Sequence, residues 1–581
     1  MAALALAAHA PLLWQLSEAW RGLDAAQVAA LPALALHLGL AVTLAAIFGR
    51  ARWWLPLLGL AALLGPAEAF YLSRFGLPSG AHLYGVIAET DWNETSALLG
   101  GWLMPLVIVI PLAMVLVALA VWRVWKADPR WRHRSRWWVI LATIVFAMVI
   151  GWGEYLVSSS ESSGNAASAS EPFYLEHSIT GRHDGLLADL EATFPWGLPI
   201  RLQRYVEHKQ TLADHMSRRL NFHFHPRWTL PPSDQLQIHV FVIGETARAD
   251  HWSLFGYGRD TTPEMLQRKR AGELAVFNDA VSAASATRES VPLMLTRRPV
   301  AKPLLPTGEP SVLTAFSQAG FRTYWLSAQG TAGTHETPVS VLAAEADLRR
   351  FINQVDYRGL GARDGELLPL LVEALKDPTP RKFIVLHTLG SHLNYAHRYP
   401  AAFEKFTPAL QANEKPDVWR ATRPETLSNA YDNSVLYTDH VLNQVISLVA
   451  QTGAIATVTY AADHGETLFD GKCKQGGHGF AAKANYHIPM FIWASATWRT
   501  SRADTWTQLS ARRDDPVTTL ALFSTLTDLA GFDANLGIGP AALGAPAWKA
   551  FPRPVTHYGD FDRDVRKYGC DATPEDRAGL P

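Results

Sequence analysis

The chain has 581 residues, a length that accommodates two or three domains. Its formal net charge of −1 excludes a global basic field of the kind that attracts nucleic acid. It contains two cysteines, Cys473 and Cys570, and because neither belongs to a Cys-x-x-Cys pair, a zinc knuckle and a thioredoxin-like motif are excluded. Many of its 21 tryptophans fall in the first third, beside apolar runs, as in the aromatic belts of membrane proteins.

The first third of the sequence predicts a membrane domain. A helical span needs about 20 mainly apolar residues, and four of five apolar runs reach that length. The first run is shorter, so a signal peptide is its alternative, but it lacks a basic leading segment and we count it as a span. The five runs are Ala2–Leu16, Ala29–Phe48, Trp53–Leu72, Leu98–Trp122 and Trp137–Val157.

Basic residues in the short loops predict the orientation of this domain. Six Lys and Arg residues lie between the fourth and fifth runs, and such residues mark cytoplasmic loops. The alternation places everything after Val157 outside the cytoplasm. Glu68, near the end of the third run, is interpreted as snorkelling to the interface. We expect a transmembrane domain over 1–157, a linker with an amphipathic or interfacial helix over 158–234, and an extracytoplasmic domain over 235–581.

From position 235 onward, strand-like runs alternate with helix-like stretches. Apolar, β-branched runs such as 238–243 and 455–460 are short enough to be buried strands. Stretches such as 427–449 have helical periodicity. This alternation predicts an α/β fold with a doubly wound, mostly parallel sheet and helices on both faces.

Acidic and imidazole side chains follow two of these strands directly. Glu245 comes after the run 238–243, and Asp463 and His464 come after the run 455–460. Ligands of open α/β sheets bind at the carboxyl ends of strands, and carboxylates with imidazole suit zinc, which keeps three protein ligands and an open position in catalytic sites. The pattern predicts a catalytic metal centre here, whereas either strand end alone would be an ordinary polar turn.

Other polar groups are candidates for the same edge of the sheet. His387 ends the strand-like run 382–387, His392 follows it, and His478 lies in a Gly-rich loop. A hydroxyl next to a metal becomes a nucleophile. Chemistry alone does not select the nucleophile among four hydroxyls, and helix capping is the ordinary role of each. The four candidate hydroxyls are those of Thr246, Ser285, Thr287 and Ser290.

The motifs in this half of the chain resemble those of the phosphoethanolamine transferases, inner-membrane members of the alkaline phosphatase superfamily. They keep the order and approximate spacing of that family, and five spans before a periplasmic domain match its architecture. The matching motifs include Gly244-Glu-Thr-Ala-Arg-Ala-Asp250, Thr287-x-x-Ser290-Val-Pro292, Leu386-His387-Thr-x-Gly390-Ser-His392, Asp463-His-Gly-Glu466 and His478-Gly479.

The resemblance implies Glu245, Asp463 and His464 as ligands of a catalytic zinc, with Thr287 as the nucleophile bound to it. His392 and His478 would bind the donor phosphate or a second zinc. The implied reaction moves phosphoethanolamine from phosphatidylethanolamine to Thr287, expels diacylglycerol, and passes the group to a lipopolysaccharide or related glycan. The implied location is the bacterial inner membrane, with the catalytic domain in the periplasm.

Departures from the family pattern leave the acceptor open between lipid A, core sugars and other glycans. In the lipid A branch an Asn-x3-Thr-x3-Glu set contacts substrate; Thr90 and Glu94 match it, but Val86 stands at the Asn position. Cys473 and Cys570 are expected either as one disulfide, which the periplasm permits, or as free thiols. The number of zinc ions and the oligomeric state stay open as well.

Three other functions compete with this hypothesis. A phosphoglycerol transferase shares the topology and the Thr nucleophile and is the main alternative. A sulfatase needs a Cys or Ser in (Cys/Ser)-x-Pro-x-Arg, and the sequence Ser290-Val-Pro292-Leu-Met294 lacks the Arg. A non-catalytic membrane scaffold or transporter is disfavoured because the full set of candidate ligands is present.

Overall fold

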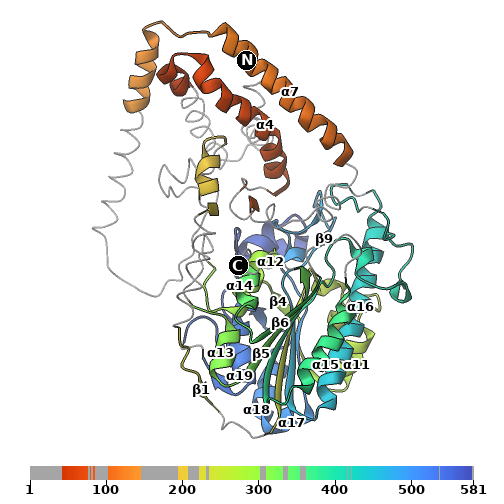
Figure 1. Ribbon diagram of the computed structural model, residues 1–581. Coiled ribbons are helices and arrows are strands. Elements are labelled where there is room, and N and C mark those ends of the chain that lie inside the picture. Colours follow the sequence, from red (N-terminus) through yellow and green to blue (C-terminus); the bar gives the residue numbers. More distant parts are fainter. Residues whose placement is uncertain are drawn as a thin grey trace. The chain divides into compact units, whose positions relative to one another are not determined.

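The computed structural model describes residues 42–75, 79, 83–84, 103–145, 194–203, 205–206, 222–229, 235–300, 309–330, 338–353, 362–414, 416–420, 422–534 and 537–578. The chain forms two compact units (Figure 1). We call Met1–Ala88 with Gly101–His208 the helical unit, and Glu89–Gly100 with Lys209–Pro581 the α/β unit.

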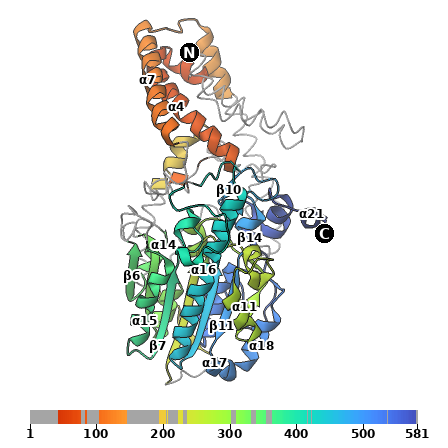
Figure 2. The ribbon, with the colours of Figure 1, turned by 90° about the vertical axis from the view of Figure 1, so that its right-hand side faces the viewer.

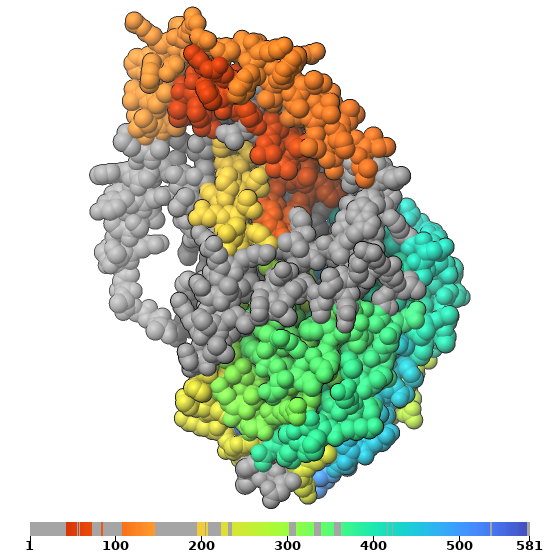
Figure 3. All heavy atoms as spheres, in the orientation of Figure 1, coloured from red at the N-terminus to blue at the C-terminus, as the bar shows by residue number. Residues whose placement is uncertain are grey.

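The helical unit contains two long helices, α4 (Ala51–Phe75) and α7 (Leu103–Ala127). Ala61 and Ala62, two small residues of α4, are buried, and Val117 of α7 packs against them. Many side chains of α7, which is drawn in orange in Figure 3, are apolar and exposed, among them Ile108 and Leu116. Such a surface suits contact with lipid rather than water.

The five predicted spans are not confirmed by the described residues. Among them, one helix, Val107–Ala127, is long and apolar enough to cross a membrane. The third run forms α4, and the start of the fifth forms the shorter apolar helix Ser135–Val145. The first run and most of the second lie outside the described residues.

The α/β unit is built on a seven-stranded sheet with the order β3-β11-β8-β2-β7-β5-β6. The neighbours from β8 to β6 are parallel, and only β11 runs against both of its neighbours. The predicted mostly parallel sheet is therefore confirmed. Its strands are β2 (Gln237–Gly244), β3 (Leu274–Phe277), β5 (Arg322–Gly330), β6 (Leu348–Asn353), β7 (Arg381–His387), β8 (Ile455–Ala462) and β11 (Met490–Ala494).

Helices cover both faces of this sheet. Figure 1 and Figure 2 show α11, α15 and α16 on one face, and Figure 1 shows α13 and α19 on the other. The helices of the unit are α11 (Pro263–Arg270), α12 (Thr287–Leu295), α13 (Val312–Gln318), α14 (Pro338–Ala343), α15 (Leu368–Lys376), α16 (Pro424–Gln451), α17 (Ala496–Ser501), α18 (Ala503–Ala511), α19 (Leu522–Leu529), α20 (Arg566–Tyr568) and α21 (Pro574–Ala578).

The central strands are buried on both faces, which explains their continuous apolar sequences. All eight residues of β2 are buried. Phe383 of β7 stacks on Phe316 of α13 with ring centroids 3.8 Å apart, while Leu386 faces Val441 of α16 across a cavity of about 10 Å³. The alternation of side chains along β7 thus serves both helical layers.

Short two-stranded pairs complete the unit. β1 lies within the predicted linker 158–234 yet pairs with β13, and the nearby Phe224 is fully buried. The core of the unit therefore begins before position 235. The short strands are β1 (Arg227–Trp228), β4 (Asp279–Val281), β9 (Thr467–Leu468), β10 (Gly476–Gly477), β12 (Pro516–Thr518), β13 (Phe532–Asp533), β14 (Pro554–Val555) and β15 (Gly559–Asp560).

Candidate metal centre and active site

The register of two neighbouring strands brings the predicted acidic residues together. Gly244, the last residue of β2, pairs with Ala462, the last residue of β8. The next residue of each strand is a carboxylate, and both Glu245 and Asp463 are buried. The Asp463 backbone N–H donates to the Gly244 carbonyl oxygen over 2.8 Å, so the two chains stay in register where the carboxylates emerge.

His464 completes a compact triad with these carboxylates. Its Nε2 lies 3.4 Å from Glu245 Oε1 and 3.5 Å from Asp463 Oδ2. Its Nδ1 lies 2.9 Å from the Gly465 carbonyl oxygen, a contact that places the ring proton on Nδ1 and leaves the Nε2 lone pair facing the carboxylates. Burial, with the nearby His478, lowers the pKa of His464 far below its usual value, so the ring is neutral.

Thr287 lies at the start of α12 with its hydroxyl against the triad. Thr287 Oγ1 donates to Glu245 Oε2 over 3.1 Å and lies 3.3 Å from His464 Nε2. Two of the other candidate hydroxyls make no contact with the imidazole of His464. Thr246 Oγ1 donates to Glu245 Oε1 over 2.6 Å, and Ser290 Oγ donates to the Thr287 carbonyl oxygen. Among the four hydroxyl candidates, Thr287 is the one whose hydroxyl reaches both a carboxylate and the imidazole.

The donor set fits a metal ion. One ligand atom each of Glu245, Asp463 and His464 lies within 4.8 Å of the others. Asp463 Oδ2 is buried and has no hydrogen-bond partner among the described residues, which is costly for a carboxylate oxygen unless a cation neutralises it. Burial, followed by repulsion from Asp463, raises the pKa of Glu245 well above its usual value. Two crowded carboxylates with a neutral imidazole are a site for a divalent cation.

The two further histidines lie near the triad. The ring centroids of His478 and His464 are 4.2 Å apart, and those of His478 and His392 are 6.5 Å apart. His478 Nδ1 lies 2.9 Å from Glu466 Oε2, whose other oxygen accepts from the Tyr395 hydroxyl over 2.7 Å. Burial, with Arg398 nearby, lowers the pKa of His392 to about 4. The His392 ring is therefore neutral, and the His478 ring lies between it and His464 with a hydrogen-bond partner in Glu466.

Several residues that hold the triad were missed by the sequence analysis. Gln329, at the end of β5, donates from Nε2 to Glu245 Oε2 over 3.1 Å and to the Thr388 carbonyl oxygen over 2.8 Å. Gly390 has φ +46° and a Cβ there would clash with the Glu245 carbonyl oxygen. A glycine in a loop after a strand, such as Gly390, is a sequence signal for a close approach of two backbones. An isolated glutamine such as Gln329 gives no such signal.

Arg248 fixes the turn after β2 to the loop after β8. Its guanidinium is buried and pairs with Asp250 and Asp470, each with distances of 2.7 Å. It also donates to the Glu466 carbonyl oxygen over 3.1 Å. The segment of Glu245 and the segment of Glu466 are thereby tied together through one side chain.

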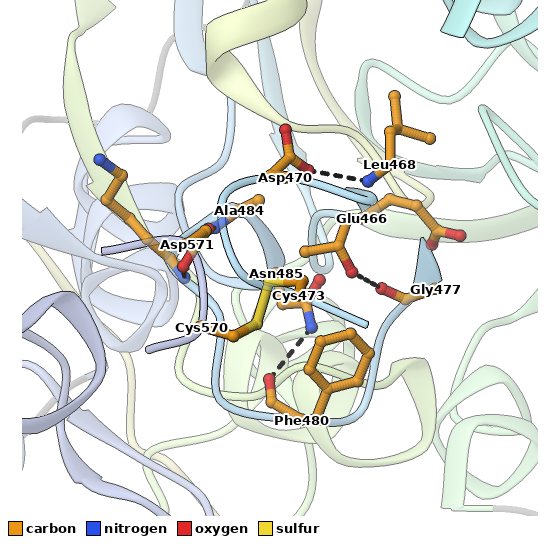
Figure 4. The surroundings of a disulfide bond; sticks show 12 residues. Glu466, Leu468, Asp470, Cys473, Gly477, Phe480, Ala484, Asn485, Cys570 and Asp571 are labelled. Carbon is orange, nitrogen blue, oxygen red and sulfur yellow. Dashed lines mark hydrogen bonds between the residues drawn. A yellow bond between two sulfur atoms is a disulfide. The ribbon is translucent and has the colours of Figure 1, made fainter. Parts of the chain in front are cut away.

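The two cysteines form a disulfide (Figure 4). This selects the bridged alternative over free thiols. Cys473 lies in the loop between Glu466 and His478, and the Cys570 N–H donates to the Ala481 carbonyl oxygen over 3.2 Å. The Asp571 carboxylate accepts from the Lys483 and Ala484 N–H groups over 2.6 and 2.8 Å. The C-terminal segment therefore clamps the loop that carries His478.

The predicted substrate residues of the membrane domain cannot be compared with the structure, because Thr90 and Glu94 lie outside the described residues. The structure brings together the predicted ligands, the predicted nucleophile and the two further histidines, which are Glu245, Thr287, His392, Asp463, His464 and His478.

The fold and this cluster define the class of protein, which is an α/β protein with a metal-binding triad and a hydroxyl at the carboxyl edge of its sheet. The chain belongs to the Sulfatase family, whose model matches residues 237–532. The match starts at β2 and includes Glu245, Thr287, Asp463 and His464.

Curated relatives confirm the resemblance seen in the sequence. Phosphoethanolamine transferase EptC of Escherichia coli K12 is 28% identical over 547 residues, covering 90% of this chain and 87% of EptC. The Kdo(2)-lipid A phosphoethanolamine 7''-transferase of the same strain is 27% identical over 548 residues, covering 89% of each chain.

Solved structures agree with the fold of both units. The periplasmic domain of E. coli EptC in complex with Zn has a TM-score of 0.52 and 28% identity, covering 59% of this chain and 97% of that domain. The integral membrane protein lipooligosaccharide phosphoethanolamine transferase A from Neisseria meningitidis has a TM-score of 0.64 and 20% identity. The match covers 92% of this chain and 96% of that chain. The second likeness supports the fold alone.

Proposed function

We propose that this protein is a zinc-dependent phosphoethanolamine transferase that moves phosphoethanolamine from phosphatidylethanolamine to a lipopolysaccharide or related glycan. The observation that carries the proposal is the Thr287 hydroxyl, held 3.1 Å from Glu245 and 3.3 Å from His464. The relatives that cover about 90% of the chain are named phosphoethanolamine transferases, and one was solved with Zn.

Glu245, Asp463, His464 and Thr287 are the residues that would hold the zinc. When bound, zinc lowers the pKa of the threonine hydroxyl and neutralises charge on the phosphoryl oxygens. The protein itself supplies position. Glu245 and His464 orient the Thr287 oxygen, and Gln329 fixes Glu245 from the side of β5. Positioning of this kind is the main protein contribution to phosphoryl transfer.

The reaction then proceeds in two substitutions at phosphorus. Thr287 Oγ1 bonds to the phosphorus of phosphatidylethanolamine, the bond to the diacylglycerol oxygen breaks, and the threonine proton ends on that oxygen. An acceptor oxygen next bonds to the same phosphorus, the bond to Thr287 breaks, and Thr287 recovers a proton from the acceptor. We assign His392 and His478 to the donor phosphate because both rings lie beside the triad. Thr90 and Glu94 remain predicted substrate contacts.

We place the protein in the bacterial inner membrane with the α/β unit in the periplasm. The disulfide supports this placement because disulfides persist in that compartment and are rare in the cytoplasm. The exposed apolar side chains of α7 support a membrane setting for the helical unit.

Phosphoglycerol transfer, the main alternative, is not favoured by the curated relatives. The sulfatase alternative is weakened by the lack of an Arg after Pro292 in a (Cys/Ser)-x-Pro-x-Arg pattern, even though the family carries that name.

The proposal is tested by trapping the intermediate. Purified protein is incubated with phosphatidylethanolamine or phosphatidylglycerol, quenched in acid and digested, and the peptide that contains Thr287 is weighed. We expect a phosphoethanolamine adduct on Thr287 with the first lipid only. Thr287→Ala should carry no adduct and lose transfer by about 10³-fold or more, whereas the remote exposed Thr500→Ala should behave as the wild type. An adduct from phosphatidylglycerol, or wild-type transfer by Thr287→Ala, would overturn it.

A further inference from the structure

A buried arginine of the helical unit is only partly satisfied by its neighbours. Arg201 is 2% exposed and lies in the helix 197–203. Its Nη1 donates to Glu68 Oε1 of α4 over 2.7 Å and to Ser79 Oγ over 3.2 Å, and it also contacts the Ser79 carbonyl oxygen. The Ser79 N–H donates to the same Glu68 oxygen over 3.0 Å. Glu68 is thus half of a buried ion pair, which corrects its interpretation as a snorkelling side chain.

The other edge of the Arg201 guanidinium has no hydrogen-bond acceptor in the part of the chain that the structure describes. Nε and Nη2 are both buried, and no described residue accepts a hydrogen bond from either of them. These two nitrogens form the fork with which arginine binds carboxylates and phosphates through two parallel hydrogen bonds. Each unsatisfied buried donor costs about 1–3 kcal/mol, and more when it is charged. A complete, unused fork therefore points to an anionic ligand rather than to a structural role alone.

The surroundings indicate which anion this is. Glu68 belongs to the last turns of the apolar helix α4, and the polar Ser79, 11 positions further along the chain, donates its backbone N–H to it. Next to Arg201, Leu202 is 52% exposed and Val206 is 45% exposed. Apolar side chains beside a basic group at the end of an apolar helix are typical of the headgroup level of a membrane. The anions at that level are lipid phosphates.

The charge of the site favours a phosphodiester over a phosphomonoester or inorganic phosphate. Glu68 already neutralises one positive charge, and its carboxylate lies 2.7 Å from Arg201 Nη1. A phosphodiester carries a single negative charge and presents two unesterified oxygens, which match the two donors of the fork. A phosphomonoester or inorganic phosphate carries nearly two charges near neutral pH, and Glu68 would repel the second.

We propose that Arg201, with Glu68 and Ser79, forms a binding site for the phosphodiester of a glycerophospholipid in the helical unit. Arg201 Nε and Nη2 hold the two phosphate oxygens, and Glu68 holds the guanidinium in place and disfavours dianions. The site concerns lipid binding alone, so it stands whether or not Thr287 transfers a phosphoryl group.

The test measures lipid binding on the full chain without turnover. Thr287→Ala protein is purified in detergent, stripped of lipid, and titrated with phosphatidylethanolamine, phosphatidylglycerol, phosphatidic acid or inorganic phosphate. Bound lipid is counted by native mass spectrometry, and the shift in melting temperature is recorded. We expect one tightly bound diester lipid and a raised melting temperature, with weaker binding of phosphatidic acid and no shift with inorganic phosphate. Equal effects of inorganic phosphate and the diester lipids would overturn the lipid assignment.

Two variants and a control locate the binding in Arg201. Arg201→Lys keeps the charge but loses the fork, and should weaken diester binding by about tenfold. The double variant Glu68→Gln with Arg201→Met removes both buried charges together, so that no unpaired charge remains to unfold the helical unit, and it should lose the bound lipid. Arg132→Gln, at an exposed arginine of the same unit, should bind as the parent does. Parental lipid binding by Arg201→Lys and the double variant would overturn the proposal.

Discussion

Two kinds of chain segment build the active site of the α/β unit, and they differ in how they are stabilised. The ligands stand on the ends of β2 and β8, where the sheet register alone brings Glu245 and Asp463 together. The groups that hold the ligands, Gln329, Gly390 and the C-terminal segment around Cys570, come from loops and strand ends without a shared register. The sheet therefore determines which residues meet, while the loops determine how accurately they are positioned.

The largest effect on the supporting segments is expected from removal of the disulfide. Replacing both Cys473 and Cys570 by Ser should lower the free energy of unfolding by about 4 kcal/mol, because the bridge closes a loop of 97 residues. The melting temperature in detergent measures this. Reducing agent should lower the wild type to the level of the variant and leave the variant unchanged. A double-serine variant as stable as the wild type would show that the backbone contacts of Asp571 hold the segment alone.

Gly390→Ala tests the close approach behind Glu245. The added Cβ would meet the Glu245 carbonyl oxygen and would sit at a positive φ, so we expect a displaced ligand and transfer reduced by about 100-fold. Gly272→Ala is the matched control, since Gly272 also has a positive φ, +70°, but has open space around it. It should cost about 1 kcal/mol of stability and leave kcat unchanged. Equal kcat in both variants would contradict the assigned role of Gly390.

Gln329→Leu tests the side-on contact to Glu245. Loss of the 3.1 Å hydrogen bond should reduce zinc affinity and kcat by about tenfold, the usual cost of losing a group that orients a ligand. Gln329→Asn keeps the amide on a shorter side chain, so its zinc affinity and kcat should lie between those of the wild type and of Gln329→Leu. Gln451→Leu at the exposed end of α16 serves as the control. Unchanged zinc affinity in Gln329→Leu would mean that the sheet register suffices to position Glu245.

The smallest effect concerns pH and a histidine inside the sheet. Burial, followed by repulsion from Arg502, lowers the pKa of His239 to about 3, and the ring lies 2.9 Å from Thr457 Oγ1. Below about pH 6.5 the His239 ring takes up a proton in the unfolded chain but not in the folded chain. Stability from neutral His239 is therefore complete above pH 6.5 and is lost as the pH falls from 6.5 toward 3. His239→Gln should show a pH dependence of unfolding shallower by one proton in this window. An identical slope would contradict burial of a neutral ring.

Much of the α/β unit was predictable because buried parallel strands have a distinctive sequence. The runs that became β2, β7 and β8 were recognised, and Glu245, Asp463 and His464 followed from their position after a strand. Thr287 needed the family motif, because four hydroxyls had equal chemistry until the structure showed which one reaches the triad.

The supporting contacts were not predictable for a physical reason. Gln329 acts through one hydrogen bond to Glu245, 84 positions away, and no periodicity marks such a contact. Arg201 and Glu68 are 133 positions apart, and the apolar runs around Glu68 report only that a helix is buried or in lipid, not which polar group it meets. Side-chain contacts between distant segments depend on packing that local sequence patterns do not contain.

The central claim is that Glu245, Asp463 and His464 bind one divalent cation beside Thr287, and metal analysis tests it most directly. Wild-type protein, Glu245→Ala, Asp463→Asn and the remote control Thr500→Ala are purified in the same way, and their zinc content per chain is measured by mass spectrometry. We predict zinc in the wild type and in Thr500→Ala, and its loss from both ligand variants while their melting temperatures show that they remain folded. Full zinc occupancy in Glu245→Ala and Asp463→Asn would contradict the account.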